Sequence, residues 1–248
     1  MESLKFWSTD HFDFSTYKWR LKERINKEWL GNGTDPGRCY YTFNELGFRG
    51  DSIKKKGLKI MSVGCGHTEG IDVNDRETWS HYLTRMLPDG VDFNLGISGV
   101  SNDYIARTIL TWTEYLNPAV VLIMYTYPAK REIYTSNGGL IPYHPIPWGY
   151  LSEELDGRKI WSNIVSCTSK EDDHINWLKN HLLISNYLKS KNIPFIWNGT
   201  FVETEYTDEN RYDGEYPKFI DSDNYATPIQ NKEYANKLLN YFKENFEI

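Results

Sequence analysis

The sequence predicts a three-layer α/β fold in which helices cover both faces of a parallel sheet. Residues 59–103 alternate twice between strand and helix patterns, and each strand leads into a glycine turn. Residues 119–124 are uniformly apolar, as expected of a central strand that is covered on both faces. The length of 248 residues suits one α/β domain with a sizeable core, so we expect a single domain over residues 1–248.

The first half of this pattern contains two strands, each followed by a turn. A strand is predicted at 59–63 and precedes the turn Gly-Cys-Gly-His-Thr-Glu-Gly at 64–70. The next helix has one apolar face, formed by Trp79, Tyr82, Leu83, Met86 and Leu87. A second strand at 91–95 runs into the turn Gly-Ile-Ser-Gly at 96–99, and Ser101 is placed to cap the following helix. Both turns therefore lie at the carboxyl ends of strands, where parallel sheets place their functional residues.

The second half contributes two further strands, predicted at 119–126 and 193–198, and three helices. The helix after Ser101 has a core-facing stripe formed by Ile105, Ile109, Trp112 and Leu116. The helix at 173–191 has a predicted inner stripe of Ile175, Leu178, Leu182 and Ser185, flanked by Trp177, His181, Ile184 and Leu188. A last helix from about residue 229 is expected to bury Ala235, Leu238, Leu239, Phe242 and Phe246.

Two segments fall outside this alternation. Residues 1–57 form an N-terminal extension, in which we expect a helix over 17–30 and a short edge strand over 40–43. The side chains expected to lie partly inside that helix are Trp19, Ile25 and Trp29. Residues 132–170 form an insertion in which glycines and prolines interrupt any regular pattern. We interpret it as a cap over the strand ends, and the alternative is a structural or oligomer-forming excursion.

Composition narrows the classes of function and partner. The net charge of −6 argues against a surface that neutralises nucleic-acid phosphates. No apolar run is long enough for a transmembrane helix, and the first twenty residues lack the apolar core of a signal peptide. The three cysteines are odd in number and lack the spacing of metal ligands, which indicates a reducing compartment. We therefore expect a cytoplasmic protein without a cofactor, and the oligomeric state stays open.

Two acidic stretches invite a metal-binding interpretation. Residues 172–174, Asp-Asp-His, stand at the predicted start of a helix, where carboxylates are favoured by the exposed N–H groups. The loop at 201–219 is rich in Asp and Glu but lacks the order of a calcium-binding EF-hand loop. We expect helix capping at the first and a solvated loop at the second, with no metal site.

The order and spacing of the glycine turns resemble the SGNH hydrolases, also called the GDSL esterase and lipase family. Residues 64–70 stand where the family has Gly-Asp-Ser, and residues 94–99, Asn-Leu-Gly-Ile-Ser-Gly, match its second block, Asn-x-Gly-x-x-Gly. Residues 44–50 resemble the lead-in that many of these proteins carry. The resemblance covers residues 41–131 and, more weakly, 221–246. It implies a flavodoxin-like sheet and the hydrolysis of esters or O-acyl groups, including those on carbohydrate.

The departures from the family pattern concern the catalytic positions. Gly66 occupies the position of the nucleophilic Ser, and Tyr225 occupies that of the general-base His. The third block ends in Tyr127 and lacks the Asn that helps to bind the oxyanion. Gly96, the family's backbone oxyanion donor, and Asp223 are the matching groups that remain. We therefore predict that hydrolysis is much reduced or lost, and the alternative is a non-catalytic binding or assembly protein that retains the fold.

Other residues in the turns offer a replacement nucleophile. Cys65 and His67 are close enough in sequence to form a thiolate pair, although a buried structural cysteine is the interpretation that we favour. Ser98 and Ser101 lack a base assigned by spacing, and helix capping explains Ser101 better.

The remaining expectation concerns a ligand. We expect a small-molecule ester or glycan to contact His67, Asn94, Tyr127 and Trp148. These side chains, with Gly66, Gly96 and Tyr225, are expected to converge at the carboxyl ends of the strands.

Overall fold

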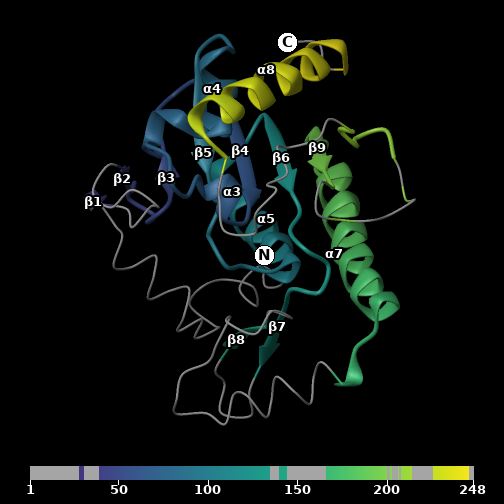
Figure 1. The fold of residues 1–248 in the computed structure, drawn as a ribbon. Helices are drawn as coiled ribbons and strands as arrows, with labels where there is room; N and C mark the ends of the chain where they lie inside the picture. The colour runs from purple at the N-terminus through teal and green to yellow at the C-terminus, as the bar shows by residue number, and fades with distance from the viewer. Residues whose placement is uncertain are drawn as a thin grey trace.

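The computed structural model describes residues 28–30, 39–134, 140–143, 166–199, 202, 206, 208–213 and 226–245. Five strands form the central sheet, in the order β3 (Arg49–Gly50), β5 (Gly90–Asn94), β4 (Leu58–Gly64), β6 (Val120–Met124) and β9 (Phe195–Asn198) (Figure 1). The last four are parallel, and β3 joins β5 in the antiparallel sense. When the parallel strands are numbered along the chain, their order across the sheet is 2-1-3-4, which is the flavodoxin-like order. The predicted α/β fold and its four strands are confirmed, with β3 as an added antiparallel edge.

The register of the parallel strands brings their carboxyl ends to one edge of the sheet. Ser62 of β4 pairs with Asn94, the last residue of β5. Gly64 pairs with Met124, and Met124 in turn pairs with Asn198. Each strand is therefore followed by a loop on the same side of the molecule, and the two glycine turns share this edge.

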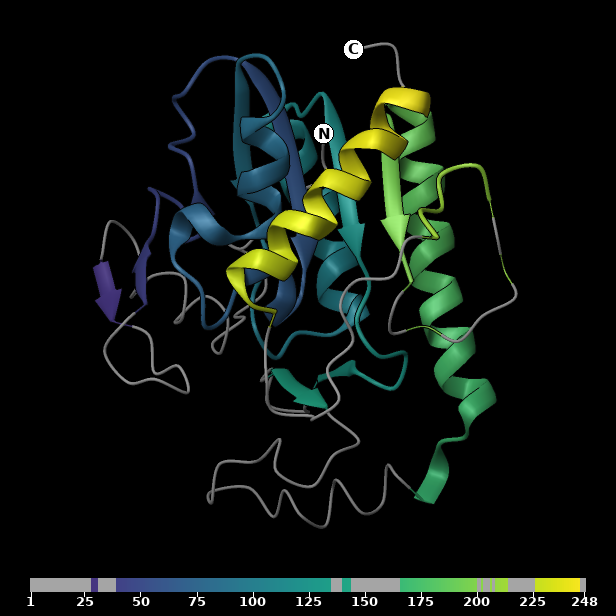
Figure 2. The ribbon, with the colours of Figure 1, turned by 45° about the horizontal axis from the view of Figure 1, so that its top comes forward.

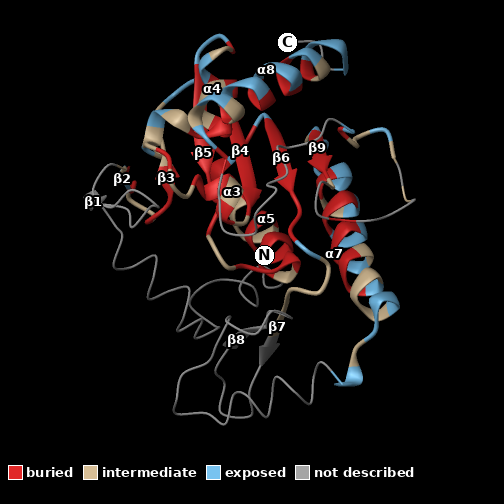
Figure 3. Cartoon of the chain, viewed as in Figure 1, coloured by how far each residue is buried: buried red, intermediate tan, exposed pale blue. Residues whose placement is uncertain are grey.

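Helices cover both faces of the sheet, as Figure 2 shows. On one face, α4 (Trp79–Arg85) and α8 (Pro228–Asn245) bury the side chains of alternate strand residues, such as Ile60 and Leu122. On the other, α5 (Asn102–Leu116) and α7 (Lys170–Ser190) cover the intervening ones, such as Met61 and Val121. The strands are buried throughout their central parts (Figure 3). Burial of each such side chain contributes about 1.5–3 kcal/mol, so these two clusters hold the layers together.

Polar side chains define where the helices begin. The Ser101 hydroxyl accepts the N–H of Tyr104 at 3.2 Å, which confirms the predicted cap of α5. The Ser169 hydroxyl accepts the N–H of Asp172 at 3.1 Å, so the acidic start of α7 is a capped helix terminus. At the other end of α5, Asn117 adopts the left-handed conformation with φ of 47° and terminates the helix.

The predicted inner stripe of α7 is wrong at two of its four positions, whereas Ser185 is buried and Leu178 packs against the core. Ile175 is 62% exposed and Leu182 is 41% exposed, although both were expected inside. The buried face is centred on the residues that were predicted to flank the stripe, namely Trp177, His181, Ile184 and Leu188. Trp177 packs against Tyr125 and Trp197 with ring centroids 5.8 Å apart. Aromatic burial against the sheet therefore sets the rotation of this helix, because large rings bury the most apolar area.

The N-terminal extension and the insertion each contain a two-stranded sheet. In the extension, β1 (Glu28–Leu30) pairs with β2 (Tyr40–Thr42), so the helix expected over 17–30 is wrong at its last three residues. Residues 17–27 lie outside the described part of the chain. In the insertion, β7 (Arg131–Tyr134) pairs with β8 (Leu140–Tyr143), although no regular structure was expected there. Cross-strand hydrogen bonding supplies the order that local periodicity does not show.

Two shorter helical elements complete the described fold. They are α3 (Gly66–Glu69) and the 3₁₀ turn η1 (Asp75–Glu77), both between β4 and α4. Within the described ranges, no helix combines the length and apolar character needed to cross a membrane.

Candidate functional site at the carboxyl ends of the strands

The two glycine turns touch each other, as the sequence predicted. The N–H of Ile97 donates to the carbonyl of Gly64 at 3.2 Å, which ties the second turn to the end of β4. A Cβ atom at Gly96 would lie 2.3 Å from the backbone N of Glu69 and 2.7 Å from the carbonyl carbon of Thr68. Only glycine allows α3 to pack this closely on the second turn.

Arg49 holds the backbone of the first turn through hydrogen bonds from its guanidinium. Its guanidinium is 1% exposed and donates to the carbonyls of Glu69 at 3.0 Å, Gly70 at 2.5 Å and Val73 at 3.0 Å. Its Nε also donates to the Asp75 carboxylate at 3.0 Å. Arg49 belongs to the lead-in motif noted in the sequence, and its contacts explain why an arginine is needed there. Its role escaped the sequence analysis because its partners lie 20 to 26 residues away.

Glu69 is a second residue that the sequence analysis did not single out. Its carboxylate is buried, at 1% residue exposure, and accepts the N–H of Ser98 at 2.5 Å. The last residue of α3 therefore holds the backbone of the second turn. Because of this contact, the position of the Ser98 N–H depends on the first turn.

Asn94 and Gly96 bond to each other instead of facing outward. The N–H of Gly96 donates to Oδ1 of Asn94 at 3.0 Å. The Asn94 amide donates to the carbonyl of Thr68 at 2.6 Å and to Oγ of Ser80 at 3.1 Å. Asn94 is 1% exposed, so it ties β5 to α3 and α4. The N–H that the resemblance assigns to an oxyanion is engaged within the protein.

Cys65 stands beside a cationic side chain at the mouth of the first turn. Nζ of Lys130 lies 3.6 Å from Sγ of Cys65 and 5.5 Å from the centroid of the Tyr127 ring. Burial raises the pKa of the Cys65 thiol, but the Lys130 ammonium lowers it by more in combination with local hydrogen bonds. Those bonds come from the N–H groups of Gly66 and Gly99 and from the Thr126 side chain. The net pKa lies below its ordinary value, which favours the thiolate.

The expected cleft residues differ in exposure. Gly66 is buried, and His67 is only partly exposed. Burial and the nearby Lys130 ammonium lower the pKa of His67 to about 4, so its imidazole is neutral and weakly basic at physiological pH. Tyr127 is 49% exposed and can present its ring to a ligand. Trp148, Asp223 and Tyr225 were also expected at the site and lie outside the described residues.

Neither acidic stretch forms a metal site in the part of the chain that the structure describes, where no group of three or more ligating side chains is found. Arg131 pairs with Asp172 at 2.8 Å and with Asp173 at 2.6 Å. The expectation of a solvated loop is wrong at Asp208. This carboxylate accepts the indole N–H of Trp197 at 2.8 Å and lies 3.2 Å from Nε2 of His181, so it anchors its loop against the core.

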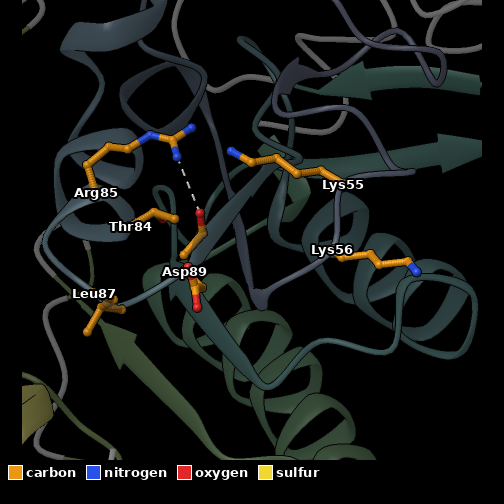
Figure 4. A pocket seen from close by; sticks show the side chains of 7 residues that line it. Lys55, Lys56, Thr84, Arg85, Leu87 and Asp89 are labelled. Carbon is orange, nitrogen blue, oxygen red and sulfur yellow. Dashed lines mark hydrogen bonds between the residues drawn. The ribbon is translucent and has the colours of Figure 1, made fainter.

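A separate cavity lies at the amino end of β5, at the opposite end of this strand from the second glycine turn. Figure 4 shows the side chains that line it. It measures about 330 Å³ and is lined by Lys55, Lys56, Thr84, Arg85, Leu87, Asp89 and Gly90. Arg85 donates to the carbonyl of Gly90 at 3.4 Å, the bond drawn in the figure. Arg85 and Lys55 also pair with Asp51, at 2.9 Å and 2.8 Å. Two of the three cations at this cavity thus share one carboxylate of the protein.

Comparisons with known proteins give structural neighbours and no sequence relatives. No family model matches the sequence, and no curated protein matches it. A protein assigned to the lipolytic G-D-S-L family from Desulfitobacterium hafniense DCB-2 is 14% identical, with a TM-score of 0.35; the match covers 74% of this chain and 98% of that one. A family 3 carbohydrate esterase from Clostridium thermocellum is 18% identical, with a TM-score of 0.32, over 76% of this chain and 96% of that one.

A third neighbour is a gut microbial diltiazem-metabolizing enzyme. It is 18% identical, with a TM-score of 0.33, and the match covers 77% of this chain and 35% of that one. This chain therefore spans about a third of that protein's length.

Proposed function

We propose that this chain binds a small ester or glycan at the carboxyl ends of its strands and does not perform serine-based hydrolysis. The observation that carries the proposal is that the nucleophile is replaced at the first turn and the backbone oxyanion donor is engaged within the protein at the second. Gly66 has no side chain to attack a carbonyl, and the N–H of Gly96 donates to Asn94 at 3.0 Å. Acyl transfer needs a nucleophile, a base within reach and free donors for the oxyanion. At the positions that match the SGNH pattern, this chain supplies none of these three groups in the form that the family uses.

What remains is suited to binding. The Tyr127 ring is half-exposed, and the Lys130 ammonium lies beside it. His67 adds a neutral imidazole that can donate or accept a hydrogen bond. An aromatic face together with a cation and a neutral donor recognises a sugar ring or the carbonyl oxygen of an ester.

The hydrolysis arm of the test uses p-nitrophenyl acetate. We expect the unmodified protein to show no enzymatic turnover, and Gly66→Ser alone to restore none, because a lone serine lacks a base. Loss of triad members costs on the order of 10⁴ to 10⁶ in turnover, with little further loss once the unit is broken. Gly66→Ser combined with Tyr225→His is the variant in which some activity is expected. Turnover by the unmodified protein that disappears on changing His67, Ser98 or Ser101 would refute the proposal.

The binding arm uses O-acetylated xylotriose as the probe, measured by saturation-transfer NMR. We expect contact signals that Tyr127→Ala abolishes. Tyr115→Ala is the matched control, because Tyr115 is 62% exposed on α5 and is not part of the proposed site. Equal signals from both variants, or none from the unmodified protein, would count against binding at the strand ends.

A second candidate function, thiol-based acyl transfer, is favoured by the contact between Lys130 and Cys65. The Cys65 thiolate would attack the carbonyl carbon of an ester, forming a C–S bond while the π electrons move to oxygen. Collapse of this intermediate releases the alcohol, which takes a proton from water, and leaves a thioester on Cys65. Water then hydrolyses the thioester to the acid and the free thiol.

This candidate predicts an unusually reactive Cys65. In a Cys39→Ser/Cys167→Ser background, the rate of alkylation by iodoacetamide is expected to rise at a lower pH than for an ordinary thiol, whose pKa is about 8.5. Lys130→Met should shift the profile to higher pH by removing the ammonium, whereas Lys130→Arg should largely preserve it. An unchanged pH profile in Lys130→Met would rule out a Cys65 thiolate that is stabilised by Lys130. Turnover of p-nitrophenyl acetate that is lost in Cys65→Ser would favour acyl transfer over binding alone.

A further inference from the structure

A buried carboxyl group lies beneath the second glycine turn, on the face of the sheet that α4 covers. Asp92 is on β5, two residues before Asn94, and is 1% exposed. Its Oδ1 has no hydrogen-bond partner among the described residues. A buried carboxylate oxygen without a partner is costly as an anion, so the site favours a proton on Asp92.

Ser80 connects this carboxyl group to the turn. Its Oγ lies 3.4 Å from Oδ2 of Asp92 and 3.1 Å from Nδ2 of Asn94. Oδ1 of Asn94 in turn accepts the N–H of Gly96 at 3.0 Å. A continuous path of hydrogen bonds therefore runs from Asp92 on β5, through α4, to the backbone of the second turn.

The single hydroxyl proton of Ser80 makes this path sensitive to charge. When Asp92 is ionised, Ser80 donates its proton to Oδ2. When Asp92 is protonated, the carboxyl O–H can donate to Ser80, and Ser80 can turn its own proton toward Oγ1 of Thr78, 3.2 Å away. The two protonation states thus reverse the direction of the bond between Ser80 and Asp92, while the Asn94 amide N–H donates to Oγ of Ser80 in both states.

We propose that Asp92, Ser80 and Asn94 form a proton-linked relay that couples the charge of a buried carboxyl group to the second glycine turn. The relay is separate from the proposed ligand-binding side chains and does not depend on their function. It would alter the turn through the Asn94 amide, which also bonds to the carbonyl of Thr68 in α3 at 2.6 Å.

The charged groups around Asp92 are mixed in sign. Nδ1 of His81, on α4, lies 4.0 Å from Oδ2. The Asp51 carboxylate accepts the N–H of Asp92 at 3.0 Å and disfavours a second negative charge, while Arg85 and Arg49 favour one. Lys55 is paired with Asp51 at 2.8 Å. Burial is the largest influence, followed by Asp51, and together they raise the pKa of Asp92 to about 7.

Such a group titrates in the neutral range and affects stability with a defined sign. The folded pKa lies above the unfolded value of about 3.9, so the folded protein binds more protons between these two values. Stability should therefore fall as the pH rises from about 4 to about 7 and should level off above that range. Asp92→Asn should remove this dependence.

The test is a pH titration of backbone amide chemical shifts between pH 5 and pH 9. We expect the Gly96 amide of the unmodified protein to shift with a midpoint near pH 7, and this shift to be absent in Asp92→Asn. In Ser80→Ala, the amide of Asp92 should still titrate while that of Gly96 no longer follows. His81→Gln is the control for the neighbouring imidazole and should leave the Gly96 titration in place.

Three results would overturn the relay. A Gly96 shift that persists in Asp92→Asn would assign the titration to another group, and one that disappears in His81→Gln would assign it to the histidine. A Gly96 shift that survives unchanged in Ser80→Ala would show that Asp92 acts on the turn by another route. Thermal unfolding over the same pH range confirms that each variant is folded.

Discussion

Replacing Arg49 with alanine is expected to lower the free energy of unfolding by about 3–5 kcal/mol, because it removes one partner of a buried charged network. The guanidinium donates to three backbone carbonyls and one carboxylate. Without it, the carbonyls of Glu69, Gly70 and Val73 lose a buried donor, and each unsatisfied group costs about 1–3 kcal/mol. The first glycine turn should loosen together with the loss of stability.

Two variants separate the causes of this effect. Arg49→Lys keeps the charge, but one ammonium cannot reproduce the fork of donors that reaches these carbonyls, so most of the loss should remain. Asp75→Asn removes the charge of a partner whose side chain is 26% exposed, and about 1 kcal/mol is expected from that change. Urea unfolding measures all three. A loss below 1 kcal/mol in Arg49→Ala would show that the turn holds itself without the arginine.

The second large loss of stability is expected at the start of the 132–170 insertion. The carboxylate of Glu132, at the start of β7, forms an ion pair with Arg107 of α5, and the two side chains are 2% and 8% exposed. The N–H of Glu132 also donates to Asp103 at 2.8 Å. Glu132→Ala removes the carboxylate that neutralises the buried Arg107 guanidinium, and breaking a buried ion pair in this way typically costs about 3–5 kcal/mol. The hairpin β7–β8 should be held less firmly to α5, because only the backbone bond to Asp103 remains of these two contacts.

A double-mutant cycle tests whether the loss comes from the buried charge that Glu132 no longer neutralises. Arg107→Met combined with Glu132→Leu replaces the pair by apolar groups of similar volume and should recover most of the stability lost in either single variant. Glu132→Gln is the matched control, since it keeps the shape and one acceptor. Additive losses in the double variant would mean that the two side chains stabilise the fold independently and that their ion pair contributes nothing. Hydrogen exchange of the 131–134 amides reports on the hairpin separately.

Local patterns were sufficient to predict the four parallel strands of the sheet but not its antiparallel edge strand β3. An apolar run followed by a glycine turn is a contiguous signal, and the strands at 58–64 and 90–94 follow it to within one residue. The contact between the two turns was also predictable, because parallel strands bring their carboxyl ends to one edge. Helix caps such as Ser101 are equally local, since the capping side chain and the N–H that it accepts are three residues apart.

The rotation of a helix about its axis and the pairing of strands were harder to predict. The stripe Ile175, Leu178 and Leu182 has helical spacing, yet α7 turns Trp177 and His181 inward because aromatic rings of β9 and the end of β6 meet them there. The strand at residues 28–30 depends on a partner at 40–42, which a helical pattern in the first segment does not reveal. Tertiary packing overrides local preference in both cases.

The linear chain specified the backbone of the candidate site: two glycine turns, a missing nucleophile at Gly66 and strands that carry both turns to one edge. The contacts between polar and charged groups at this site depend on the tertiary structure. Lys130 reaches Cys65 across 65 positions, and Arg49 reaches α3 across 20. The physical reason is that backbone conformation follows from neighbouring residues, whereas charge, pKa and hydrogen bonding depend on groups that only folding brings within a few ångströms.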